Sequence, residues 1–181
     1  MRLLPLLLLV GLLLGGCSLP RLILLNDPLD ARQHNDLGVA YEQRGETDLA
    51  LREYLRAAEL DSGWGRPLIN RGNVLAASRD WSGAAKSYRQ ALRREPGNAE
   101  AMNNLAWVLL QAGEGEAALD HARQAVSIDP LQPAFLDTLA EILLAQKAFS
   151  EARRIIDQAL ALAPAPQLRA SLERKLSQLD D

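Results

Sequence analysis

The feature that most constrains the fold is a repeat of 34 residues. Four blocks align without a gap, over residues 31–64, 65–98, 99–132 and 133–166. The eighth position is Gly or Ala in every block, and positions 20 and 27 are Ala in all four. Only small side chains let two helix backbones approach closely, and the Pro at position 32 of three blocks ends the preceding helix. Each block therefore predicts two helices of about 13 residues joined by a tight turn.

Composition supports an all-α fold and excludes several classes of function. Leu and Ala supply 65 of the 181 residues, whereas the β-branched residues Val, Ile and Thr supply 13. The net charge of −3 gives no electrostatic reason to expect nucleic acid as a partner. A single Cys and two His leave no disulfide and no Cys- or His-rich metal site. We therefore expect no metal, no cofactor and no small-molecule substrate.

The small residues at positions 8, 20 and 27 resemble the tetratricopeptide repeat (TPR). This resemblance implies a right-handed α-solenoid of four helix-turn-helix units over residues 31–166. Two residues depart from the pattern, because Arg71 stands where Leu is expected and Ala122 replaces an aromatic residue. Leucines at helical spacing in residues 167–181 predict an amphipathic helix that caps the fourth unit. A docking helix for a partner is the alternative.

The first 30 residues predict export and a membrane anchor. Met1 and Arg2 precede an apolar run that is too short to span a bilayer and ends in Leu14-Gly15-Gly16-Cys17. This ending resembles the bacterial lipoprotein signal. The resemblance implies that residues 1–16 are removed and that Cys17 is lipidated. Because Ser18 rather than Asp follows, it also implies the outer membrane, on the periplasmic side. A plain secretory signal and a buried apolar helix are the alternatives.

Residues 17–30 then form the lipidated cysteine and a tether. Leu22-Ile23-Leu24-Leu25 is an apolar run where a flexible linker would be polar. We expect this run either to cover the first repeat or to lie on the membrane surface.

The family resemblance also predicts a binding groove. It places positions 2, 5, 6, 9 and 12 of each unit on the concave face, where amides recur and one tryptophan stands. A side-chain amide can pair with a peptide backbone, and tryptophan is a frequent binding anchor. The predicted groove residues are Asn35, Asn70, Asn73, Asn103, Asn104, Trp107 and Glu141. We place the recognition centre at Asn70, Asn104 and Trp107. Alternatively, the amides are ordinary family sequence and Trp107 fills space between repeats.

Residue chemistry argues against one subtype of the family. Members that grip a C-terminal carboxylate use two Asn and several basic residues. Asn73 and Asn104 match the two Asn, but Ala134 and Thr138 occupy the basic positions of the next block. The sequence therefore argues against a carboxylate clamp.

The remaining aromatic and histidine residues are interpreted as packing or surface residues. We expect Trp81 and Phe149 to wedge between the two helices of their units, and Trp64 to pack at a repeat junction. His34 is expected to be a partly buried filler, and His121 to be exposed.

These observations predict a non-catalytic adaptor that holds a protein or peptide partner in the bacterial cell envelope. The resemblance implies a role of the kind that lipoproteins of this repeat class have, as assembly pilots for pili and secretins or as adaptors for envelope enzymes. A structural self-assembling lipoprotein is the alternative. An enzyme is disfavoured, because the sequence has no nucleophile–base arrangement, metal set or phosphate loop.

Overall fold

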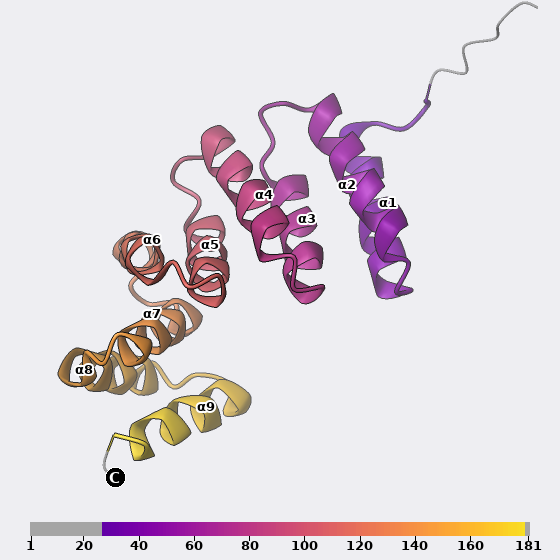
Figure 1. Ribbon diagram of the computed structural model, residues 1–181. Coiled ribbons are helices and arrows are strands. Elements are labelled where there is room, and N and C mark those ends of the chain that lie inside the picture. Colours follow the sequence, from indigo (N-terminus) through magenta and orange to yellow (C-terminus); the bar gives the residue numbers. More distant parts are fainter. Residues whose placement is uncertain (1–26, 180–181) are drawn as a thin grey trace, which may run out of the picture.

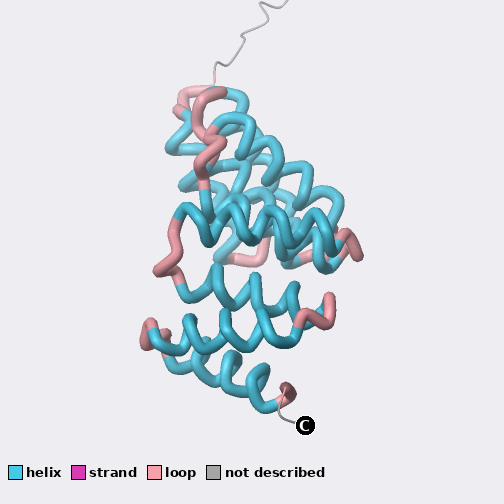
Figure 2. The backbone as a smooth tube through the Cα atoms, turned by 90° about the vertical axis from the view of Figure 1, so that its left-hand side faces the viewer, coloured by secondary structure: helices cyan, strands magenta, loops and turns pink. Residues whose placement is uncertain are grey.

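The computed structural model describes residues 27–179, so the expected signal, Cys17 and most of the tether lie outside the described residues. Within residues 27–179 the fold consists of helices and short loops (Figures 1 and 2). The helices are α1 (Ala31–Gln43), α2 (Thr47–Leu60), α3 (Arg66–Ala77), α4 (Trp81–Arg94), α5 (Ala99–Gln111), α6 (Gly115–Ile128), α7 (Pro133–Ala145), α8 (Phe149–Ala161) and α9 (Pro166–Ser177). Among these residues, no helix has the length and apolar character needed to cross a membrane.

The helices form four pairs and a final single helix, which confirms the predicted all-α helix-turn-helix architecture. The pairs stack into an arc in which α3, α5 and α7 lie on the inner side and α4, α6 and α8 on the outer side (Figure 1). The first helix of each pair therefore faces the concave surface.

The two helices of each pair are joined by a turn that contains one residue with positive φ. Gly45 and Gly113 have φ of 75° and 81°, and the equivalent Arg79 and Lys147 both have 61°. A left-handed residue just after a helix lets the following amides bond to its last carbonyls. The turn geometry is thus the same in all four units, although only two of them place Gly there.

Side-chain caps fix several helix starts. Asp30 and Gln33 form a capping box at α1, in which Asp30 Oδ1 accepts from the Gln33 N–H at 2.8 Å. Asp80 accepts from the Gly83 N–H at 2.9 Å, and Asn98 accepts from the Ala101 N–H at 2.9 Å. Each cap satisfies an amide that the helix leaves unpaired and contributes roughly 1 kcal/mol.

Close packing within the first two units depends on glycine. A Cβ atom on Gly38 would lie 2.6 Å from the Tyr54 ring, and one on Gly72 would lie 2.5 Å from the Tyr88 ring. Both tyrosines are buried. In these two units, the absence of a side chain at position 8 therefore leaves the space that a tyrosine of the second helix fills.

One large hydrophobic core runs through most of the chain, from Ala58 in α2 to Leu172 in α9. Leu172 is fully buried, and the apolar face of α9 is thereby used within the chain itself. A smaller separate cluster of Ala50, Tyr54 and Val74 stabilises the first unit.

The structure corrects three of the packing predictions. Phe149 does not wedge between helices, because 53% of its surface is exposed. His121 is half-buried rather than exposed. His34 is not a mere filler: it is buried, and it lies between Asp27 at 3.0 Å and Glu53 at 2.6 Å. Trp64 is half-buried at a repeat junction, as predicted.

Candidate functional site: an amide-lined cleft on the concave face

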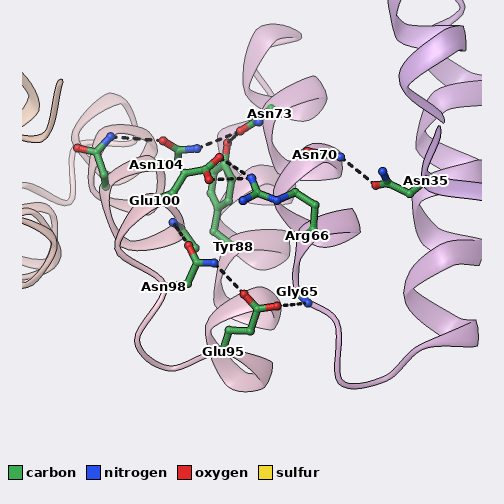
Figure 3. Close-up of polar contacts among 12 residues, drawn as sticks. Asn35, Gly65, Arg66, Asn70, Asn73, Tyr88, Glu95, Asn98, Glu100 and Asn104 are labelled. Atoms are coloured by element: carbon green, nitrogen blue, oxygen red, sulfur yellow. Dashed lines mark hydrogen bonds and ion pairs between the residues drawn. The ribbon is translucent and has the colours of Figure 1, made fainter. Parts of the chain in front are cut away.

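Polar side chains of the inner helices form hydrogen-bonded links between neighbouring repeats (Figure 3). Asn70 Nδ2 donates to Asn35 Oδ1 at 2.9 Å and connects α3 to α1. Arg66 Nη1 donates to both carboxylate oxygens of Glu100, at 2.9 and 2.7 Å, and connects α3 to α5. The concave face is thus held in register by contacts between repeats.

A second set of amides forms a chain between α3 and α5. Asn104 Nδ2 donates to Asn73 Oδ1 at 3.1 Å, and Asn103 Nδ2 donates to Asn104 Oδ1 at 3.3 Å. Tyr88 from α4 also donates its hydroxyl to Asn73 Oδ1, at 2.7 Å. Asn73 Oδ1 therefore accepts twice, which leaves its Nδ2 directed away from these two donors.

These amides line a cleft of about 290 Å³. Its lining residues come from α3, α4, α5 and α7 and are Asn73, Ala76, Ala77, Tyr88, Asn103, Asn104, Trp107 and Thr138. Four of the seven predicted groove residues are therefore brought together: Asn73, Asn103, Asn104 and Trp107. Asn35 and Asn70 lie outside this cleft as a separate pair, and so does Glu141.

Asn103 gives the cleft an unused acceptor. Its Oδ1 is buried and has no hydrogen-bond partner among the described residues. Buried polar atoms are almost always paired, so this unpaired acceptor in the cleft lining would gain a hydrogen bond if the Asn103 side chain rotated toward an external donor. A peptide N–H has the right chemistry for this acceptor, and the amide chain can also supply donors to peptide carbonyls.

Trp107 packs between repeats and also lines the cleft. Its ring meets that of Trp81 from the preceding repeat edge to face, with centroids 5.4 Å apart and planes at 82°. This geometry is favourable for aromatic pairs and holds Trp107 in one orientation. The residue thus packs between repeats and still lines the cleft.

Tyr88 is a cleft residue that the sequence analysis did not single out. Burial, and secondarily the charge of Glu100, raise the pKa of its hydroxyl, so the group stays protonated and donates. This fixed donor determines which side of the Asn73 amide is the acceptor. The sequence held one signal for this contact: among the four repeats, only the second combines a Tyr at position 24 with an Asn at position 9.

Glu141 is already engaged by the final helix. Lys175 Nζ lies 3.4 Å from Glu141 Oε2 and 2.7 Å from Asp137 Oδ1. These contacts neutralise the acidic part of the concave face on α7 and connect it to α9. Over residues 27–179, no group of three or more His, Cys, Asp or Glu side chains is arranged to hold a metal ion.

Comparison with known proteins gives one distant curated relative. The chain is 26% identical over 133 residues to the type IV pilus assembly protein PilF of Pseudomonas aeruginosa, which covers 72% of this chain and 53% of PilF. The chain therefore spans about half the length of this relative.

Solved structures with the same fold include MamA and YrrB. MamA (residues 41 to the end) from Desulfovibrio magneticus RS-1 matches with a TM-score of 0.71 and 20% identity, over 83% of this chain and 86% of MamA. YrrB, described as a TPR protein with an unusual peptide-binding site, matches with a TM-score of 0.68 and 21% identity, over 83% of this chain and 76% of YrrB. At this identity the likeness shows the fold alone.

Family models give the assignment. One model of the tetratricopeptide repeat matches residues 21–67 and 69–133, and a second matches residues 109–176. Together with the helix pairs and the small residues between them, these matches show that the chain belongs to the tetratricopeptide repeat family, whose members are protein-binding scaffolds and generally non-enzymatic.

Proposed function

We propose that this protein is a lipid-anchored adaptor of the bacterial cell envelope that binds an extended segment of a protein partner in its concave cleft. The observation that carries the proposal is the buried, unpartnered Asn103 Oδ1 within a chain of amides beside Trp107. Amides recognise the backbone of a peptide, and a held tryptophan supplies apolar contact area. This combination favours an extended, mainly uncharged segment.

Similarity to PilF supports pilus assembly as the pathway. The name of that relative assigns it to the assembly of type IV pili, and the matched region covers most of the helical part of this chain. The proposed partner is therefore a protein of the pilus assembly machinery. Because about half of PilF lies outside the aligned region, the proposed pathway rests on the aligned 133 residues alone.

The proposed anchor is a lipid on Cys17, with the outer membrane as the location. Its support is the position of the chain's single Cys directly after Leu14-Gly15-Gly16. Mass spectrometry of the protein purified from its own bacterium tests this, since an acylated Cys17 would be the first residue. Finding residues 1–16 still attached, or a free thiol at Cys17, would exclude the anchor.

The binding site is tested by capture from the native envelope with matched variants. Asn103→Ala removes the unpartnered acceptor and one long hydrogen bond, whereas Asn70→Ala removes an amide that lies outside the cleft. We expect the captured partner to be lost with Asn103→Ala and retained with Asn70→Ala, at equal helicity by circular dichroism. Equal capture by both variants would show that the cleft is not the binding site.

A further inference from the structure

The outer helices of the solenoid differ sharply in charge. α4 carries four basic residues and no acidic one. In α2, α6 and α8, by contrast, acidic residues equal or outnumber basic ones. In a chain with a net charge of −3, this concentration of positive charge on one outer helix is a local feature.

Most of this charge is available for binding. Lys86 and Arg93 are exposed and have no acidic partner among the described residues. Arg89 is exposed and lies 3.8 Å from Glu114. Residues 86, 89 and 93 share one face of the helix, since they are three and four positions apart. Arg94 is occupied structurally, because it donates to backbone carbonyls of Ala58, Asp61 and Trp64.

One exposed leucine of α2 lies beside these cations, and a second lies at the end of α2. Leu55 and Leu60 of α2 are both 44% exposed. Leu55 also borders a shallow cleft of about 400 Å³ between α2 and α4, whose lining includes Ala58, Leu68 and Arg93. The outer face of α2 and α4 therefore combines apolar side chains with an excess of positive charge, although the acidic Glu59 also lines this cleft and pairs with Arg56.

The described chain begins next to this face. Asp27, the first described residue, contacts Arg56 of α2 at 3.6 Å as well as His34 of α1. Arg56 and Leu60 are one helical turn apart on α2. The described chain begins at the edge where α2 and α4 also end (Figure 1). Cys17 precedes Asp27 by ten residues, and an extended stretch of that length spans at most about 35 Å.

We propose that the outer face of α2 and α4 lies against the phospholipid bilayer that holds the anchor. Lys86, Arg89 and Arg93 contact anionic headgroups, and Leu55 and Leu60 enter the interface between headgroups and acyl chains. This inference rests on the proposed lipidation of Cys17. It has a functional consequence: with the outer helices on the membrane, the amide-lined cleft of the inner helices faces away from it and is open to a partner.

The test removes the proposed lipid anchor by using the mature chain with Cys17→Ser, and it measures binding of this chain to vesicles of defined composition. We expect the chain to bind phosphatidylglycerol vesicles in a salt-dependent manner and not to bind phosphatidylcholine vesicles. Each cation near an anionic surface strengthens binding by roughly fivefold. Lys86→Glu combined with Arg93→Glu should therefore weaken binding by more than about tenfold.

A matched variant distinguishes the effect of charge on this face from the effect of the total charge of the protein. Arg154→Glu with Arg169→Glu changes the net charge equally on α8 and α9, at exposed residues. We expect this variant to bind nearly as well as the parent. Leu55→Ser with Leu60→Ser should weaken binding while leaving its salt dependence unchanged. Circular dichroism confirms that all variants fold.

Three results would overturn the inference. They are absence of binding to phosphatidylglycerol vesicles, equal losses in the two charge variants, and binding only to a glutamate-rich peptide in place of vesicles. The last would make the face a protein-docking surface. None of them affects the mass measurement of Cys17, so failure of the membrane contact is distinguishable from failure of the anchor.

Discussion

The first and fourth repeats share one backbone plan but are stabilised in different ways. The first helix of the fourth repeat buries Phe135, Leu136, Thr138, Leu139, Ala140, Ile142 and Leu143. The first helix of the first repeat buries only His34, Asn35 and Gly38. At position 4 of the repeat, the fourth unit has a leucine and the first has a histidine between two carboxylates. The fold thus requires small residues at a few positions and tolerates either apolar or polar stabilisation elsewhere.

This difference has a consequence for local stability. The large core joins the second, third and fourth repeats to α9 and includes Ala58 at the end of α2, whereas Tyr54 of the first repeat belongs to a small separate cluster. Regions with few buried apolar contacts open more readily than the rest of a protein. We therefore expect α1 and α2 to exchange their amide hydrogens sooner than α7 and α8.

The largest loss of stability is expected from a substitution in the fourth repeat, whose first helix is mainly apolar. Leu136→Ala removes a fully buried side chain at position 4 and should lower the free energy of unfolding by about 3 kcal/mol. Urea denaturation followed by circular dichroism measures this loss. A change below about 1 kcal/mol would mean that the fourth repeat can collapse around the cavity, and the contrast with the first repeat would fail.

The next effect concerns the glycine–tyrosine contact. Gly72→Ala would place a methyl group 2.5 Å from the Tyr88 ring, so the helices must separate or the ring must move, at a cost of about 1–3 kcal/mol. In the third repeat the equivalent pair is Ala106 and Ala122, both fully buried. Ala106→Gly is the matched control and should cost about 1 kcal/mol from backbone entropy alone.

A double-mutant cycle sharpens this prediction. If the clash with the ring is the cause, the cost of Gly72→Ala should nearly disappear in a Tyr88→Ala background. Independent effects of the two substitutions would contradict the proposed contact. The same cycle also tests the cleft, since Tyr88 donates to Asn73 there.

The fold was largely predictable because the period fixes which residues face each other. The helix pairs and the small residues at positions 8, 20 and 27 follow from the 34-residue alignment. The left-handed conformation of Arg79 and Lys147 could not be predicted in this way. Neither residue favours positive φ, and the packing of the two helices imposes it.

The candidate site was only partly predictable, because periodicity assigns a side chain to a face and not to a partner. Asn70 and Asn104 occupy the same repeat position, yet one pairs with Asn35 and the other lines the cleft. Trp81 and Phe149 also occupy one position. Trp81 meets Trp107 of the next repeat, whereas α9 has no aromatic residue, and Phe149 remains exposed.

A smaller effect is expected from the ionic contacts of the first repeat. Glu53→Gln removes the charge that lies 2.6 Å from His34 Nδ1 and should cost about 1 kcal/mol. Hydrogen exchange should then accelerate roughly fivefold in α1 and α2 and remain unchanged in α7 and α8. Acceleration throughout the chain would show that the first repeat opens only with the whole molecule.

The smallest predicted effect is a pH dependence at His121 of α6, outside the first repeat. Burial, and secondarily Arg89, lower the pKa of His121, while Asp120 opposes them; its Nδ1 is buried without a partner. The unfolded chain therefore binds a proton more readily than the folded one. Stability should fall as the pH drops through the unfolded value near 6.5, and level off below the folded pKa. His121→Gln should flatten this slope in denaturation experiments between pH 7.5 and pH 5.

An unchanged slope in that variant would assign the pH dependence to other groups. The place where the protein opens at low pH then tests the assignment to His121 directly. Acid that acts through His121 should accelerate exchange in α6 and its neighbours α5 and α7. Acceleration confined to α1 and α2 would contradict a role for His121, because Ala50 and Tyr54 of α2 belong to a cluster outside the main core.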